Sequence, residues 1–186
     1  MNVTMPPYGS LEERALLLLA DRGSRHAGLS LAKLLRGTVV ESDVPKRMDR
    51  ADAPSAIVVR FGLSGLLESE FAVAFERADA QRLGDRLLGR SGTDANAPLD
   101  VLARSAIEEV GNIVVSTFIQ INSMVSDSTS VPTAPVLLEG LASRRGVEAI
   151  GSQLRLDIDV ESRLWLVWAP TEEGIKGALR AAGQLK

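Results

Sequence analysis

Apolar residues recur every three or four positions in several stretches of the chain, which is the spacing of one buried face of a helix. Ser10, with Glu13 three residues later, is typical of a capping box and predicts a helix that ends near Gly23. A last helix is expected to begin at Thr171, a suitable N-cap. Further helices are predicted at about 25–35, 78–88 and 99–125, the last of these with an interruption.

Short runs rich in β-branched and aromatic residues lie between these helices and predict strands. The runs occupy about 38–44, 56–61, 70–75, 129–138, 153–160 and 163–168. A glycine-containing turn between the second and third runs predicts a hairpin. Trp165 and Trp168 fall on opposite faces of the last strand, and we expect both to be buried in the core. The segment 90–98, rich in Ser, Gly, Asp and Asn, is predicted to be a linker.

The order of the predicted elements repeats on the two sides of this linker. Each half, about 10–90 and 98–185, reads helix, helix, strand, strand, strand, helix. Pro45 and Pro135 lie ninety positions apart, which fits a repeat of about that length. The pattern therefore predicts an α/β (α+β) protein in which two similar halves form a single domain, residues 1–186.

Composition and charge narrow the classes of function. The chain has 186 residues, 45% of them hydrophobic, and a net charge of −3, which suits a globular domain with a sizeable core. No run of Lys and Arg creates a basic face, so neither a nucleic acid nor a membrane is an expected partner. The sequence has no cysteine, and His26 is its single histidine. Disulfides, cysteine nucleophiles, and metal sites rich in Cys or His are therefore excluded.

The sequence gives no sign of export or membrane insertion. The first residues lack a basic segment followed by an apolar one, so no signal peptide is expected. The apolar run 15–20 is far too short to span a membrane. We therefore expect a soluble cytoplasmic protein.

The predicted helix 99–125 carries an unusual polar face. Ser105, Glu109 and Asn112 are spaced i, i+4 and i+7, so they project from one side of the helix. The opposite side carries an apolar stripe, composed of Ala103, Ala106, Ile107, Val110, Ile113, Val114 and Phe118. Asn and Gly are poor residues for a helix interior, so helix stability alone does not explain Asn112 and its neighbour Gly111. The sequence thus predicts an exposed carboxylate beside an exposed amide.

These residues resemble the signature of the CheC/CheX/FliY family of bacterial chemotaxis phosphatases. That signature reads Asp or Ser, three residues, Glu, two residues, Asn, twenty-two residues, Pro, and it is matched here by Ser105, Glu109, Asn112 and Pro135. The resemblance is strongest to the CheC branch. It implies a pseudo-twofold duplicated fold with a mixed, mainly antiparallel sheet and helices packed on it.

The chemistry of the pair fits phosphoryl transfer from a partner. An Asn amide has no usable pKa, so Asn112 suits orientation of a water molecule better than proton abstraction. The sequence shows neither a lysine clamp nor a metal site of its own. The resemblance implies that a phosphorylated CheY-like receiver supplies Mg²⁺, phosphoaspartate and a lysine. It further implies that Asn112 orients the attacking water and that Glu109 pairs with that lysine. Ser105 and Pro135 would support the motif, and this chain would bind no cofactor.

The first half lacks the corresponding pair. Ninety-one positions before Glu109 and Asn112 stand Leu18 and Asp21. Leu18 cannot replace a carboxylate, and an ionised Asp21 has no amide hydrogens to donate. CheC-like proteins often have two sites, whereas we interpret Leu18 and Asp21 as a degenerate first site and expect one active site.

Alternatives to a phosphatase stay open. Glu109 and Asn112 are also compatible with an ordinary solvated helix face. The chain could serve as a binding module, either as a CheC-like partner of the CheD deamidase or as a FliY-like component of the flagellar switch. A hydrolase of small molecules is not favoured, because no Ser–His pair, carboxylate pair or phosphate-binding loop is present.

Overall fold

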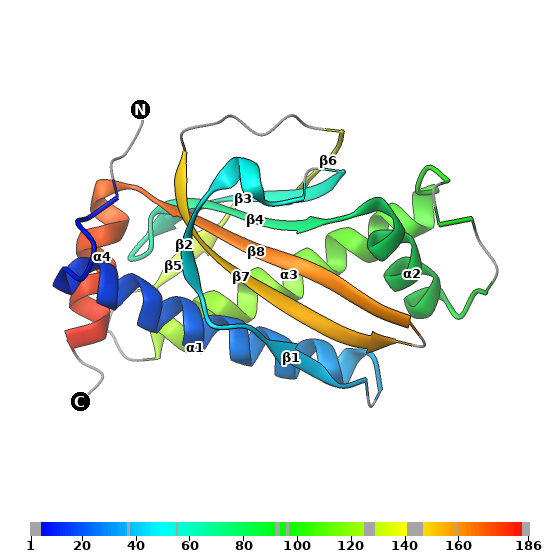
Figure 1. Ribbon diagram of the computed structural model, residues 1–186, viewed down its shortest axis with the longest axis horizontal. Coiled ribbons are helices and arrows are strands. Elements are labelled where there is room, and N and C mark those ends of the chain that lie inside the picture. The colour runs from blue at the N-terminus through cyan, green and yellow to red at the C-terminus, as the bar shows by residue number, and fades with distance from the viewer. Residues whose placement is uncertain are drawn as a thin grey trace.

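The computed structural model describes most of the chain, namely residues 5–36, 38–54, 56–91, 94–95, 97–124, 129–140, 147–158 and 160–183. These residues contain two long helices and two shorter ones (Figure 1). The long helices are α1 (Leu11–Leu34) and α3 (Val101–Ser123), and the short ones are α2 (Arg77–Leu88) and α4 (Glu172–Gly183). Thr171 Oγ1 accepts a hydrogen bond from the N–H of Gly174 at 3.1 Å, so Thr171 caps α4 as predicted.

The described strands form one antiparallel sheet. They are β1 (Val40–Ser42), β2 (Lys46–Asp49), β3 (Ile57–Gly65), β4 (Ser69–Phe75), β5 (Ser130–Pro132), β6 (Val136–Glu139), β7 (Glu148–Ile158) and β8 (Val160–Pro170). A short 3-10 helix, η1 (Arg50–Asp52), follows β2. The sheet order is β1-β7-β8-β4-β3-β5, with β2 also paired to β7 and β6 also paired to β3. The predicted class, a mixed α+β fold with an antiparallel sheet, is therefore confirmed, as is the β3–β4 hairpin.

The two halves of the chain contribute to each other's part of the sheet. In the first half α1 is followed by β1 to β4 and α2, and in the second half α3 is followed by β5 to β8 and α4. The strands β1 and β2 pair with β7, whereas β5 and β6 pair with β3, and β4 pairs with β8 at the centre. Pro45 directly precedes β2 and Pro135 directly precedes β6, which are equivalent places in the two halves. That the halves arose by duplication stays a prediction.

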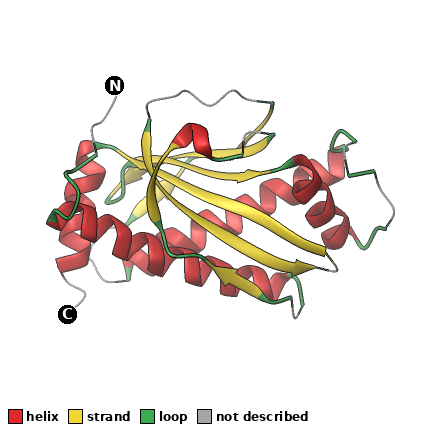
Figure 2. Ribbon diagram, viewed as in Figure 1, coloured by secondary structure: helices red, strands yellow, loops and turns green. Residues whose placement is uncertain are grey.

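The main core lies between the sheet and the helices α1 and α3, which both cover the same face (Figure 2). An aromatic cluster marks its centre. The ring of Phe118, on α3, lies 4.9 Å from that of Phe71 and 5.4 Å from that of Trp168, measured between centroids. Such tilted and edge-on contacts add to the stabilisation that burial of these rings provides.

Several local predictions were wrong, and close packing explains the clearest case. The helix does not end near Gly23, because α1 is continuous from Leu11 to Leu34. A Cβ at position 23 would lie 2.2 Å from Phe118 Cδ2, so Gly23 permits α1 and α3 to approach each other. Similarly, α3 shows no interruption. Each half thus has one long helix, not two, before its strands.

The strand predictions were incomplete in both halves. The sequence pattern did not predict β2, and the segment 129–138 forms two short strands, β5 and β6, not one. Trp168 is buried as expected, but Trp165 is only partly buried and lies on the face of the sheet opposite α1 and α3. Among the described residues, no helix is both long enough and apolar enough to cross a membrane.

Candidate functional site

The N-terminus of α3 is anchored by a side-chain cap. Asp100 Oδ1 accepts a hydrogen bond from the N–H of Ala103 at 2.8 Å. Arg90 Nη1 lies 2.5 Å from the other oxygen of this carboxylate. Two hydrogen bonds lower the pKa of Asp100: the bond from the Ala103 N–H has the larger effect, and the bond from Arg90 the next largest. The helix therefore begins at a defined residue, which sets the rotation of every later side chain on it.

The apolar side of α3 rests on the sheet. The buried positions include five from the predicted stripe, namely Ala103, Ile107, Val110, Val114 and Phe118. Gly111 faces β3, since a Cβ there would lie 2.8 Å from Val59 Cγ1 and 3.2 Å from Phe61 Cζ. Because this side is fixed against β3, the opposite side of α3 faces away from the core.

The candidate site lies on that outer side of α3. Ser105 and Glu109 are exposed, and Asn112 is partly buried. Within the described residues, the side chains of Glu109 and Asn112 have no hydrogen-bond or ion-pair partner. A carboxylate and an amide one helical turn apart are thus available to a second molecule.

Contacts on both sides of this pair place it beside the edge of the sheet. Near the start of α3, Arg104 Nη1 forms an ion pair with Glu139 Oε1, at the end of β6. Further along α3, Ser116 lines a shared groove with Pro132, at the end of β5. Glu109 and Asn112 fall between these two contacts, and Pro135 falls between β5 and β6. Ser105, Glu109 and Asn112 therefore lie along α3, and Pro135 lies in the segment that joins β5 to β6.

A groove continues the polar face toward the C-terminus of α3. It has a volume of about 440 Å³ and lies between α3 and β5. Its lining is mainly apolar and consists of Ser116, Ile119, Gln120, Ser123, Met124, Thr129 and Pro132. The sequence pattern did not predict this groove, because its lining also includes Thr129 and Pro132, which lie beyond the end of α3. The exposure of Met124, at 72%, becomes visible only in the fold.

The corresponding face of α1 carries different chemistry. The buried positions of α1 from Leu16 to Leu31 match those of α3 from Ile107 to Asn122 when shifted by 91 residues. In this register Leu18 corresponds to Glu109 and Asp21 to Asn112. Leu18 is 47% exposed, and the carboxylate of Asp21 lies 3.0 Å from Arg25 Nε in an i, i+4 ion pair. This face therefore presents a leucine and a neutralised carboxylate.

No metal centre is found among the described residues, where no three His, Asp or Glu side chains gather in a group that could hold an ion. His26 Nδ1 lies 2.9 Å from the carbonyl oxygen of Arg22, one turn earlier in α1. The single histidine thus makes a local contact within α1.

No family model matches the sequence, and no curated protein matches it. Solved structures do match. FliY from Thermotoga maritima is 13% identical with a TM-score of 0.71, and the alignment covers 99% of this chain and 100% of that one. CheX from Borrelia burgdorferi, in a complex with CheY, BeF3 and Mg²⁺, is 17% identical with a TM-score of 0.63, over 83% of this chain and 98% of that one. FliM from H. pylori, in a complex with SpeE, is 15% identical with a TM-score of 0.68, over 95% of this chain and 97% of that one. The chain therefore has the fold of the CheC/CheX/FliY chemotaxis proteins, which FliM shares.

Proposed function

We propose that this protein is a phosphatase that hydrolyses the aspartyl phosphate of a CheY-like receiver domain in bacterial chemosensory signalling. The observation that supports this most directly is the pair formed by the exposed Glu109 and the partly buried Asn112, whose side chains have no partner in the described structure. The pair stands on the long helix of a fold that CheX shares, and CheX has been crystallised with CheY, BeF3 and Mg²⁺. The receiver would contribute the Mg²⁺, the phosphoaspartate and a lysine.

Asn112 is proposed to orient the attacking water. Its amide oxygen would accept a hydrogen bond from the water, so the water oxygen points at phosphorus in line with the bond between phosphorus and the aspartate oxygen. As the water oxygen bonds to phosphorus, the bond between phosphorus and the aspartate oxygen breaks. The aspartate leaves as a free carboxylate with the bonding electrons, and the protons of the water stay with the phosphate product, as dihydrogen phosphate. Asn112 takes no proton in this step, because an amide is too weak a base. Its partly buried position on a fixed helix limits the number of orientations that the amide can adopt.

Glu109 is proposed to hold the receiver in register. Its exposed carboxylate would pair with the receiver lysine in a charge-assisted contact. Ser105 stands one turn before Glu109 on the same face, and Pro135 removes a backbone N–H from the edge segment beside the pair. Both would shape the site without touching phosphorus. Leu18 and Asp21 are proposed to be a degenerate first site, so the protein would have one active site.

The lifetime of the phosphate on a receiver from the same organism tests this proposal. We expect the protein to shorten that lifetime, and we expect Asn112→Ala to lose at least about tenfold in rate while binding the receiver within about twofold of the parent. Gln153→Ala is a matched control, since it removes an amide from β7, on the other side of the sheet from α3. The proposal fails if every receiver phosphate of the organism keeps its lifetime in the presence of the parent protein.

A second candidate function is that of a binding module, either in a flagellar switch or with CheD. It is favoured by the similarity to FliM, which was also solved in a complex with FliG. Under this alternative the parent protein would bind a partner without shortening the lifetime of any receiver phosphate. Asn112→Ala would then change nothing, which separates the two functions in the same assay.

A further inference from the structure

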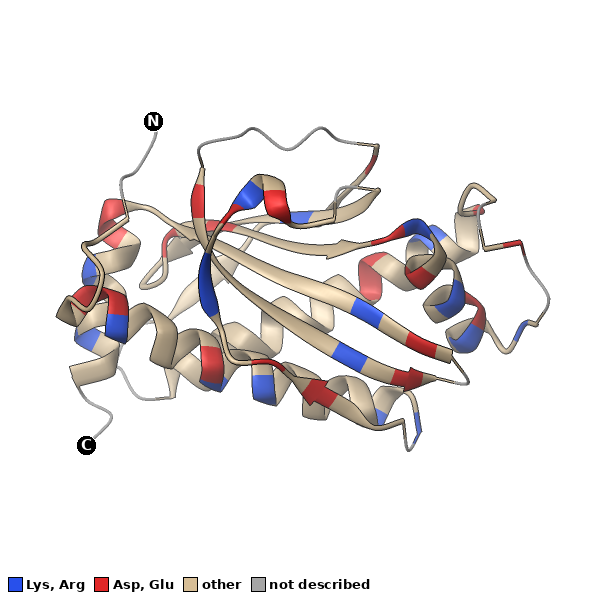
Figure 3. Cartoon of the chain, in the orientation of Figure 1, with Lys and Arg blue, Asp and Glu red and all other residues tan. Residues whose placement is uncertain are grey.

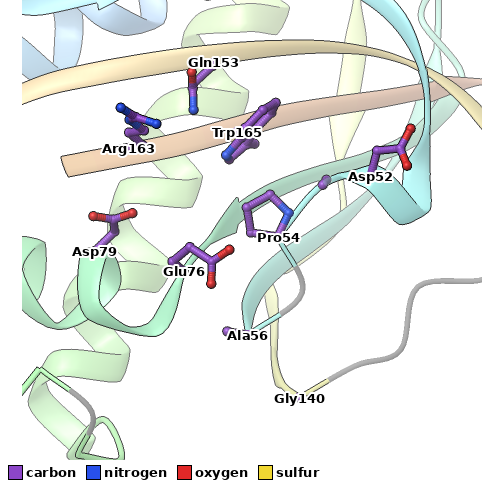
Figure 4. Close-up of a pocket in the computed structure, with 10 residues that line it drawn as sticks. Asp52, Pro54, Ala56, Glu76, Asp79, Gly140, Gln153, Arg163 and Trp165 are labelled. Atoms are coloured by element: carbon purple, nitrogen blue, oxygen red, sulfur yellow. The ribbon is translucent and has the colours of Figure 1, made fainter.

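A large hollow lies on the face of the sheet that α1 and α3 leave uncovered (Figure 4). Its volume is about 610 Å³. The strands β7 and β8 form its floor, and the segment after η1 and the start of α2 form its walls. The hollow and the helix α3, which carries Glu109 and Asn112, lie on opposite faces of the sheet. This hollow is therefore independent of the phosphatase proposal.

An incompletely covered tryptophan forms part of the floor. In the register of the sheet, Trp165 stands opposite Ala74 on one side and Gln153 on the other. Alanine is too short to cover an indole ring, so Trp165 stays partly exposed although it is in the middle of a sheet. Its ring lies between Arg163 and Pro54 in the hollow (Figure 4).

The charges around the ring are mainly negative. Glu76 is exposed at the N-terminus of α2 and makes no side-chain capping hydrogen bond. Asp52 adds a second carboxylate to the lining. Among the described lining residues the one cationic side chain is Arg163, and it is already neutralised. Its Nε and Nη2 donate to Glu161 Oε1 at 2.8 and 2.5 Å. Asp79, also in the lining, is paired with Arg82. The hollow thus offers an aromatic face beside two carboxylates, Glu76 and Asp52, that have no counter-charge among the described residues.

We propose that this hollow binds a guanidinium or alkylammonium group. A cation over the face of an indole is attracted by the ring electrons, and a carboxylate at the rim adds a direct ionic contact. Trp165 would supply the ring, and Glu76 would supply the carboxylate. Gln153 can accept a hydrogen bond from the same cation through its amide oxygen. The hollow is large enough for the whole side chain of an arginine or a lysine.

The cation could come from a free small molecule or from a basic segment of a protein partner. Two probes distinguish these sources. N-acetyl-arginine amide represents the isolated group, and a fluorescein-labelled peptide of six arginines alternating with glycine represents the segment. N-acetyl-citrulline amide is the control for both, because it has nearly the same shape as the arginine probe without its charge.

The indole N–H signals of the two tryptophans report binding in a ¹H–¹⁵N spectrum. Trp168 is 1% exposed in the core, so its signal is an internal reference for folding. We expect the arginine probe to shift the Trp165 signal saturably while Trp168 stays unchanged. The citrulline probe should shift neither. Tighter binding of the peptide than of the small probe would identify a protein segment as the source, whereas equal affinity would identify a free small cation.

Substitutions at the rim and floor test which residues bind. We expect Glu76→Gln to weaken binding of either probe about threefold to fivefold. Trp165→Leu should weaken peptide binding, measured by fluorescence anisotropy, by at least about threefold. Glu172→Gln is the matched control, because this exposed glutamate opens α4, at the far end of the molecule (Figure 1). The proposal is overturned if the citrulline probe shifts Trp165 as far as the arginine probe does. It is equally overturned if Glu76→Gln and Glu172→Gln behave alike.

Discussion

Gly111 lies so close to Val59 that a Cβ on the glycine would be 2.8 Å from Val59 Cγ1. This contact seats the middle of α3 directly on β3. Gly111 and Asn112 are neighbours in sequence, so the side chain of Asn112 leaves the helix about 100° away from this contact. The glycine that weakens the helix therefore sits where the helix touches the sheet, next to the residue proposed to orient water.

We predict that Gly111→Ala lowers the stability of the fold. Overpacking costs about 1–3 kcal/mol, whereas the better helix propensity of alanine returns about 1 kcal/mol, so the loss should be about 1 kcal/mol. Urea unfolding followed by circular dichroism measures it. Gly183→Ala is the control, since a Cβ at position 183 meets nothing within 4 Å. If Gly111→Ala and Gly183→Ala were both as stable as the parent, the predicted overpacking of position 111 against Val59 would be contradicted. In the background of Val59→Ala, Gly111→Ala should cost less than it does in the parent, because the shorter side chain leaves room for the new Cβ.

Glu109→Ala should weaken binding of the receiver more than it slows the chemical step. Loss of a charge-assisted contact predicts about tenfold lower affinity, and a smaller dependence of that affinity on salt. Calorimetric titration with a receiver carrying beryllofluoride, at two salt concentrations, measures both. Glu108→Ala is the matched control, because Glu108 is the adjacent carboxylate but points about 100° away around the helix. Equal affinities for the Glu109 and Glu108 variants would remove the docking role of Glu109.

The polar face of α3 could be predicted because it depends on local periodicity alone. The stripe that contains Ile107, Val110 and Val114 fixes which side of the helix is buried, and the exposure of Glu109 follows. The capping signals at Ser10 and Thr171 are also local, and both side chains accept the expected hydrogen bond. These features need no knowledge of what packs against them.

Features that depend on a partner distant in sequence could not be predicted. Glycine is a common residue at the end of a helix, so Gly23 was predicted to end one. The close approach of Phe118, which leaves no room for a Cβ at position 23, explains why α1 instead continues through this glycine. The strand β2 is stabilised by pairing with β7, about a hundred residues later, and its own sequence is mostly polar. Trp165 is partly exposed because its cross-strand neighbour is Ala74. In each case tertiary contacts override the local pattern.

The cap of α3 should make stability depend on pH in the acid range. The pKa of Asp100 is lowered in the folded state, mainly by the hydrogen bond from the Ala103 N–H and next by Arg90. A carboxylate whose pKa is lowered by folding stabilises the fold at pH values above its pKa in the unfolded chain, which is about 3.9. This stabilisation is lost as the pH falls through the pKa of the folded state. Asp100→Asn keeps a capping oxygen without a titrating charge. We expect the parent to melt at a higher temperature than this variant at pH 7, and the gap to close in the acid range. A gap that stayed constant down to pH 2 would contradict the prediction.

The first half offers the strictest test of a single active site. Leu18 and Asp21 occupy the positions on α1 that Glu109 and Asn112 occupy on α3, so the double variant Leu18→Ala, Asp21→Ala should keep the full rate of receiver dephosphorylation. The ion pair between Asp21 and Arg25 is an exposed i, i+4 pair, and its loss should cost less than about 1 kcal/mol. The rate and the melting temperature should be measured on the same preparation, beside Asn112→Ala. If the α1 variant lost its activity while its melting temperature stayed within a few degrees of the parent, the site on α1 would be active and the one-site proposal would be wrong.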